Sequence, residues 1–142
     1  MIDTLYIAAD HAGVDLKNAL KAHIEKKIIV YDLGTDSSNS VDYPDYAEKV
    51  CQALKQNNSA RGVLICGTGI GMSIAANRHR HIRAALCATP EAAKMARLHN
   101  DANVLVLGAR VLDTAQALAI VDAFLATDFE GGRHAQRVAK FS

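Results

Sequence analysis

The chain has 142 residues, half of them hydrophobic, and its 16 basic and 15 acidic residues leave a formal net charge of +1 at pH 7. This size is typical of one domain with a hydrophobic core, and the balanced charge argues against a nucleic-acid-binding or membrane-surface protein, which needs a basic face. The apolar runs are too short to cross a bilayer, and the N-terminus lacks the basic segment followed by an apolar segment that marks a signal peptide. We therefore expect a single domain over residues 1–142 that binds neither nucleic acid nor membrane.

Short apolar runs alternate along the chain with longer segments of helical spacing. The runs occupy residues 4–9, 28–33, 62–67, 82–87 and 103–108. None of them alternates polar with apolar residues, which is typical of strands buried on both faces of a parallel sheet. Helices are predicted at about residues 13–26, 45–57, 89–98 and 114–126, with another beginning near Ile70 and a last one after Gly132.

This alternation of strands and helices predicts a Rossmann-like, doubly wound α/β fold, with a five-stranded parallel sheet and helices on both faces. The expected strand order is 2-1-3-4-5. Ligands of such sheets bind beyond the carboxyl ends of the strands. The segments to inspect for a site are therefore residues 10–13, 34–35, 66–71 and 108–110.

The segment "CGTGIG", residues 66–71, places a cysteine before three closely spaced glycines. Glycines let backbone N–H groups turn toward a ligand, and a helix beginning near Ile70 would add its positive end, so an anion site is favoured over a plain turn. The dinucleotide pattern G-x-G-x-x-G fails because its third glycine is replaced by Met72, and no lysine follows as in a phosphate loop. A nucleotide-dependent oxidoreductase is therefore disfavoured.

The three cysteines have neither the spacing of a disulfide framework nor that of a zinc motif, so we interpret them as reduced thiols of a cytoplasmic protein. Cys51 and Cys87 are expected to be core residues. Two interpretations of Cys66 stand side by side. A helix N-terminus or a nearby cation lowers a thiol pKa and makes the sulfur a base or nucleophile, whereas a thiol that simply ends a buried strand is inert.

Basic residues near the C-terminus suggest a phosphate site. Arg133 and Arg137 lie four residues apart, so a helix would present both guanidinium groups on one face, which suits phosphate oxygens, although a solvated surface is the commoner reason for such a pair. His134 is expected to point elsewhere, on the surface. His99 ends a helix before the fifth strand, at the opposite edge of the sheet from Cys66. Either this histidine is unrelated to the site, or a second subunit supplies it.

Six short motifs are specific in combination: Asp10-His11, Asp42-Tyr43-Pro44, "CGTGIGMSIAAN" (66–77), "HND" (99–101), "GAR" (108–110) and "EGGRHAQR" (130–137). Together they resemble the type B ribose-5-phosphate isomerases, whose wider group includes galactose-6-phosphate and allose-6-phosphate isomerases. The resemblance implies that the enzyme interconverts ribose 5-phosphate and ribulose 5-phosphate through an enediolate, with no metal or other cofactor. The alternatives are allose 6-phosphate or galactose 6-phosphate as substrate, or a phosphosugar-binding module without turnover.

The resemblance also implies roles for individual residues. Cys66 corresponds to the base that moves the proton between C1 and C2, and Thr68 belongs to the loop that stabilises the enediolate oxygen. His99 corresponds to the residue that opens the furanose ring, with Asn100 beside it. The other matched positions contact the substrate, and they are Asp10, His11, Tyr43, Gly67, Gly69, Gly71, Arg110, Arg133 and Arg137. Because the family builds its site between two subunits, a homodimer or homotetramer is expected, which would account for the position of His99.

Overall fold

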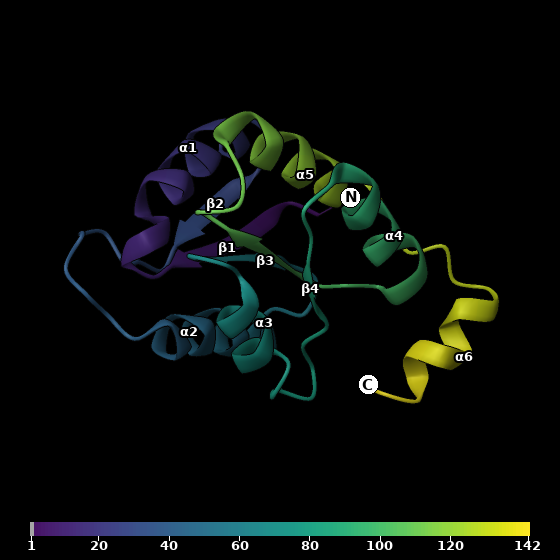
Figure 1. Cartoon of the computed structure of the whole chain (residues 1–142). Coiled ribbons are helices and arrows are strands. Elements are labelled where there is room, and N and C mark those ends of the chain that lie inside the picture. The colour runs from purple at the N-terminus through teal and green to yellow at the C-terminus, as the bar shows by residue number, and fades with distance from the viewer. Residues whose placement is uncertain (1) are drawn as a thin grey trace.

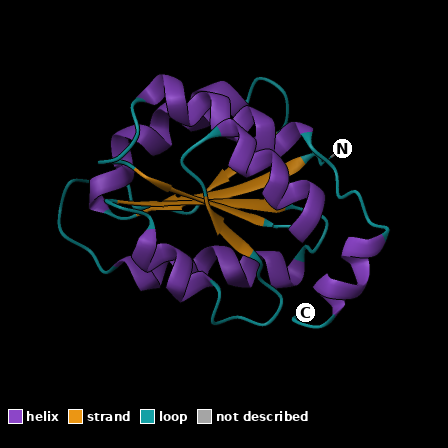
Figure 2. Cartoon of the chain, turned by 45° about the vertical axis from the view of Figure 1, so that its right-hand side comes forward, coloured by secondary structure: helices purple, strands orange, loops and turns teal. Residues whose placement is uncertain are grey.

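Five parallel strands form one sheet in the computed structural model, which describes residues 2–142 (Figure 1). The strands are β1 (Thr4–Ala9), β2 (Ile29–Asp32), β3 (Arg61–Cys66), β4 (Ala84–Leu86) and β5 (Val104–Gly108). Each of the paired strands runs parallel to its neighbour, and helices cover both faces of the sheet (Figure 2). The predicted α/β fold is thereby confirmed.

The helices divide into two layers and one outlying segment. They are α1 (Val14–Ile24), which follows a short 3₁₀ turn, α2 (Tyr43–Gln56), α3 (Ile70–Ala76), α4 (Pro90–Asn100), α5 (Thr114–Ala126) and α6 (Arg133–Ala139). Helices α1, α4 and α5 pack on one face of the sheet and α2 and α3 pack on the other, while α6 follows α5 in the chain and packs beside α4 (Figure 1). No helix within residues 2–142 is both long and apolar enough to span a bilayer.

The strand order is β2-β1-β3-β5-β4, so the predicted order 2-1-3-4-5 is wrong at one edge. All five residues of β5 are buried, whereas β4 is three residues long and none of its residues is fully buried. The longer apolar strand gains more from burial on both faces, so it lies inside the sheet and the short strand takes the edge. At the other edge, β2 alternates exposed and half-buried residues, which corrects the prediction that it is buried on both faces.

Hydrophobic side chains fill the space on both faces of the sheet. Phe124 of α5 belongs to one layer and Met72 of α3 to the other, and neither side chain reaches solvent. Cys87 lies in the first layer and Cys51 in the second, as predicted. Burial raises the pKa of Cys51 to about 12 and that of Cys87 to about 11, so both thiols stay protonated at neutral pH.

A buried ion pair fixes the chain where it leaves β2. Lys17 of α1 has no exposed surface and donates to both carboxylate oxygens of Asp32 at 2.7 Å. Asp32 also accepts the N–H of Gly34 at 2.9 Å. Partial burial alone would raise the pKa of Asp32, but the hydrogen bonds from Lys17 and Gly34 and the charge of Lys17 lower it below its ordinary value. The pair therefore holds the start of the segment that leads to Tyr43.

Candidate functional site

The ends of three strands are tied together by backbone hydrogen bonds at the carboxyl edge of the sheet. The N–H of Asp10, after β1, donates to the carbonyl of Ile65 at 3.1 Å, and the N–H of Arg110, after β5, donates to the carbonyl of Gly67 at 2.9 Å. The carbonyl of Cys66 accepts a further bond at 2.8 Å from the residue before Arg110. The sheet itself therefore brings the motifs at residues 10–11, 66–71 and 108–110 to one place.

Close side chains explain two glycines of the 66–71 loop. A Cβ added at Gly67 would lie 2.8 Å from a guanidinium nitrogen of Arg110, and one added at Gly71 would lie 2.5 Å from the ring of Tyr43. Gly69 has a φ of +80°, in the left-handed region that side chains disfavour. The glycines thus admit a guanidinium and a phenol to the loop as well as exposing backbone, a role that sequence spacing did not reveal.

Asp10 and His11 are oriented by neighbouring backbone groups. A carboxylate oxygen of Asp10 accepts the N–H of Ala12 at 3.0 Å, and Nδ1 of His11 accepts the N–H of Val41 at 3.2 Å. Because Nδ1 is the acceptor, a neutral His11 carries its proton on Nε2. Nε2 is therefore the hydrogen-bond donor of the neutral ring.

Cys66 ends β3 and borders the glycine loop. Its residue surface is 5 % exposed, whereas Cys51 in the core has none. Beyond it, Thr68 is exposed, and its hydroxyl accepts the N–H of Ile70, the first residue of α3, at 3.2 Å. The helix thus begins where the sequence predicts. The role of Cys66 as a base stays a prediction.

The remaining candidate residues lie at the opposite end of the sheet. His99 and Asn100 end α4, beside the segments that lead into β4 and β5, and Arg133 and Arg137 are exposed on α6. Figure 1 shows α6 and the β2–α2 loop at opposite ends of the sheet. One chain therefore holds two separate groups of candidate residues, and the structure does not bring them together.

His134 is buried, which corrects its predicted surface position. It is 5 % exposed, and its ring stacks on that of His99 with centroids 4.2 Å apart and planes at 15°. Gly131 and Gly132 both have positive φ, and the N–H of Glu130 donates to a carbonyl of α4 at 3.1 Å, so the chain turns and packs α6 against α4. The double glycine before Arg133 was the sequence signal for this turn.

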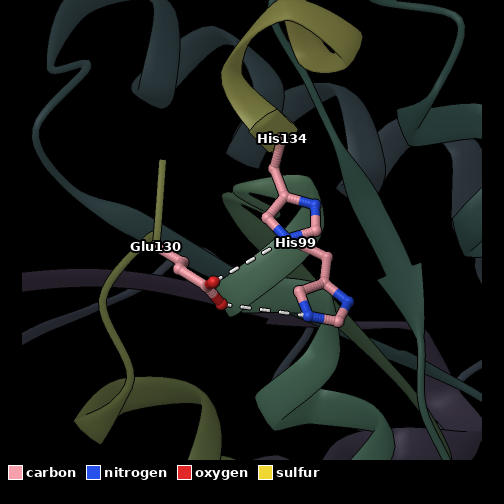
Figure 3. Close-up of side chains that lie close together, drawn as sticks. All are labelled: His99, Glu130 and His134. Carbon is pink, nitrogen blue, oxygen red and sulfur yellow. Dashed lines mark ion pairs between the residues drawn. The ribbon is translucent and has the colours of Figure 1, made fainter. Parts of the chain in front are cut away.

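Figure 3 shows that Glu130 faces both histidines of this stack. Burial, followed by the nearby His99 and Arg133, lowers the pKa of His134, while Glu130 acts against this change. Sequence reasoning missed this cluster because it placed His134 on the surface. The available signal was the double glycine between Glu130 and Arg133, because it permits the sharp turn that brings Glu130 back to His134.

Comparison with known proteins identifies the class of protein that this fold and site define. The sequence pattern of the Ribose/Galactose Isomerase family matches residues 5–141. Ribose-5-phosphate isomerase B of Escherichia coli K12 is 49 % identical over 130 residues, which cover 91 % of this chain and 87 % of the relative. The chain therefore belongs to the ribose/galactose isomerase family, as its motifs predict.

Solved structures agree with this assignment. A ribose 5-phosphate isomerase from Thermotoga maritima is 53 % identical with a TM-score of 0.94, covering 97 % of this chain and 96 % of that one. Ribose-5-phosphate isomerase B from Mycoplasma genitalium, solved with bound ribulose-5-phosphate, is 41 % identical with a TM-score of 0.93, covering 96 % and 92 % of the two chains. The family and the fold are thus established, and the roles of single residues stay predictions.

Proposed function

We propose that this protein interconverts ribose 5-phosphate and ribulose 5-phosphate through an enediolate intermediate, without a metal or other cofactor. The observation that carries the proposal is the 49 % identity with the ribose-5-phosphate isomerase B of Escherichia coli over 91 % of this chain. The Mycoplasma genitalium relative, which holds ribulose-5-phosphate, supports the same substrate class. The free cysteines of the chain fit a reducing compartment, and we place the enzyme in the cytoplasm.

The proposed chemistry is proton transfer by Cys66 beside the glycine loop. The thiolate removes the proton from C2 of the open-chain aldose, and the electrons of the C1 carbonyl move onto its oxygen to give the enediolate. The proton of the C2 hydroxyl passes to the C1 oxygen, and the Cys66 thiol returns its proton to C1, which gives the ketose and restores the thiolate. Donors from Thr68, Gly69 and Gly71 hold the oxygen on which negative charge develops, and one such contact stabilises a transition state by about 3–4 kcal/mol. A correctly positioned base increases the rate of such a proton transfer by roughly a hundred- to ten-thousand-fold.

Basic residues from both ends of the sheet are proposed to hold the substrate. Arg110 and His11 reach it from the carboxyl edge, and Arg133 and Arg137 reach it from α6. The phosphate is remote from C1 and C2, so its binding energy serves to align the sugar with the base. Tyr43 and Asp10 contact the sugar itself.

Two subunits are proposed to share each site. Since His99 and Asn100 lie at the opposite end of the sheet from Cys66, a single chain cannot apply ring opening and proton transfer to the same sugar. A twofold axis that places α6 and the end of α4 against the partner's glycine loop creates two equivalent complete sites. A homodimer is therefore the smallest active unit, and a homotetramer would pair two of them.

Replacement of the proposed base tests the chemistry. Cys66→Ala should abolish turnover of ribose 5-phosphate while the variant still binds the sugar phosphate, and Cys87→Ala, which removes a buried thiol, should remain active. Retained turnover in Cys66→Ala would show that another group is the base. The wild-type protein is assayed on ribose, allose and galactose phosphates side by side, and if it exchanges no substrate proton with solvent in any of them, it is a binding module and not an isomerase.

A further inference from the structure

Three potential metal ligands converge at the end of α4, and the proposed reaction uses only one of them, His99. Nε2 of His99 lies 4.0 Å from one carboxylate oxygen of Glu130, and Nε2 of His134 lies 4.0 Å from the other. All three ligand atoms lie within 4.8 Å of one another. In Figure 3 both imidazole rings present a nitrogen to the carboxylate.

One atom of this cluster lacks a hydrogen bond. Nε2 of His134 is buried and makes no hydrogen bond, and it is the only such buried side-chain atom found within residues 2–142. Buried polar atoms in folded proteins almost always have a partner, so this nitrogen calls for an explanation. Because it lies beside a second imidazole and a carboxylate, a metal ion is a suitable partner.

We propose that His99, Glu130 and His134 together bind one Zn²⁺ ion. Two imidazoles and one carboxylate form a ligand set that zinc takes in proteins, with water in the fourth position. Magnesium and calcium prefer sites made wholly of oxygen ligands, so they fit this set poorly. The site is separate from any cofactor role, because the proposed isomerisation uses no metal.

The cluster can close around an ion with small side-chain movements. Zinc holds nitrogen and oxygen ligands at about 2.0–2.2 Å, so its tetrahedral ligands lie about 3.3 Å apart, closer than the present spacing. The side chain of His134 is 7 % exposed and fixed by packing, whereas those of His99 and Glu130 are 39 % and 54 % exposed. The exposed imidazole must turn out of the ring stack so that its lone pair meets the metal. One anchored ligand and two adjustable ligands therefore make the site.

Zinc bound here would act as an inhibitor of the isomerase. The ion occupies Nε2 of His99, the group proposed to open the furanose ring, so the enzyme would lose turnover of the closed sugar. This consequence rests on the proposed function. The binding of zinc itself does not, because it depends only on the three ligands.

Direct titration of the metal tests the site without any measurement of activity. The protein, with no histidine tag and freed of metal by EDTA, is titrated with Zn²⁺ by calorimetry, and one ion per chain is expected to bind. His134→Asn and Glu130→Gln should each weaken binding at least about tenfold, since even the loss of an outer-shell partner of a metal has that effect. Cobalt(II) as a substitute should give visible absorption bands in the wild type that the His134→Asn variant lacks.

A matched control separates the cluster from an ordinary histidine–carboxylate pair. His23 lies 2.8 Å from Asp122, and its side chain is 34 % exposed, close to that of His99. His23→Asn should leave the zinc affinity unchanged. Equal affinity in wild type and folded His134→Asn would overturn the proposal, and so would loss of binding in Cys66→Ser alone, which would place the ion on the sulfur.

Activity is then measured with and without the metal. The wild-type rate in EDTA should fall as Zn²⁺ is added, at concentrations that match the calorimetric affinity, while each variant is compared with its own metal-free rate. Mg²⁺ at the same concentrations should not inhibit. Zinc binding by a protein with no isomerase activity in EDTA would refute the proposed function and leave the metal site intact, whereas activity without zinc binding would refute the metal site alone.

Discussion

The two ends of the sheet hold candidate site residues in different ways. At the carboxyl edge the backbone bonds of Asp10 and Arg110 lock the glycine loop to neighbouring strands. At the other end α6 packs against α4, and Arg133 and Arg137 are exposed. The first group is held in place within one chain, whereas the second group lies at the opposite end of the sheet from the glycine loop of the same chain.

This difference teaches which part of the proposed site needs a partner. A base and an oxyanion cradle must be placed accurately, because misplacement by about 1 Å costs about a hundredfold in rate. Phosphate-binding arginines tolerate more freedom, since a long guanidinium side chain can follow its ligand. A second subunit can therefore supply α6 without disturbing the loop.

The largest expected effect comes from mixing two inactive variants. Cys66→Ala and His99→Ala homodimers should each be inactive on ribose 5-phosphate, because each lacks one essential group in both sites. After subunit exchange, half of the dimers are mixed and each holds one intact site, so about a quarter of wild-type activity should return. Exchange is followed by native mass spectrometry, and absence of any recovery after confirmed exchange would place both groups in the same chain.

Removal of the buried cation should destabilise the carboxyl edge strongly. Lys17→Met removes the ammonium that contacts both oxygens of Asp32, so the free energy of unfolding in urea should fall by about 3 kcal/mol. This is near the lower end for a broken buried pair, because Asp32 keeps the N–H of Gly34 and some contact with water. Lys21→Met is the matched control, because its ammonium lies 3.9 Å from Asp32 and is more exposed. An equal effect of both substitutions would contradict a special role for the buried lysine.

The same pair predicts a dependence on pH. Since the folded pKa of Asp32 is lowered from 3.8, the pair stabilises the fold above pH 3.8 and loses that contribution as pH falls through the lower folded value. The difference in unfolding free energy between wild type and Lys17→Met should therefore shrink on acidification. A difference that stays constant down to pH 2 would show that the lost stability comes from packing and not from charge.

The sequence predicted the elements better than their arrangement. Apolar runs and helical spacing located every strand, and the predicted helix 114–126 coincides with α5. The predicted order of β4 and β5 failed because residues 82–87 look as apolar as residues 103–108, yet the strand itself is only Ala84–Leu86. Arg83, just before the strand, is tied to the loop before β5. Its N–H donates to the side chain of Asn103 at 2.7 Å, and its guanidinium donates to the carbonyl of Asp101 at 2.7 Å. Such loop contacts cannot be seen in a hydrophobic pattern.

The site was predictable where it follows strands and unpredictable where it depends on packing. Carboxyl ends of parallel strands meet by topology, so Asp10, Cys66 and Arg110 could be grouped in advance. The burial of His134 could not be predicted in this way, because it depends on the two glycines that turn α6 toward α4. The approach of Tyr43 to the glycine loop likewise results from the path of a long loop, which local residue patterns do not specify.

The two ends of the sheet also differ in how closely atoms pack around their glycines. A Cβ added at Gly108, after β5, would lie 2.6 Å from the backbone oxygen of Thr68, whereas nothing lies within 4 Å of one added at Gly131. Gly108→Ala should displace the glycine loop and lower kcat/KM about a hundredfold. Gly131→Ala, at a φ of +71°, should cost about 1 kcal/mol of stability with a smaller loss of rate. A larger loss of rate in Gly131→Ala would contradict the idea that the loop is the more exacting part.

The smallest effect is expected at the exposed arginines of α6. Arg137→Gln keeps a polar side chain but removes the charge, so KM for ribose 5-phosphate should rise about tenfold while kcat changes little, as expected when a contact holds substrate and transition state equally. Arg78→Gln, an exposed arginine after α3 outside the proposed site, is the control and should leave both constants unchanged. A fall in kcat with constant KM would mean that α6 acts in the chemical step. Both ends of the sheet would then have to be positioned accurately, and not the glycine loop alone.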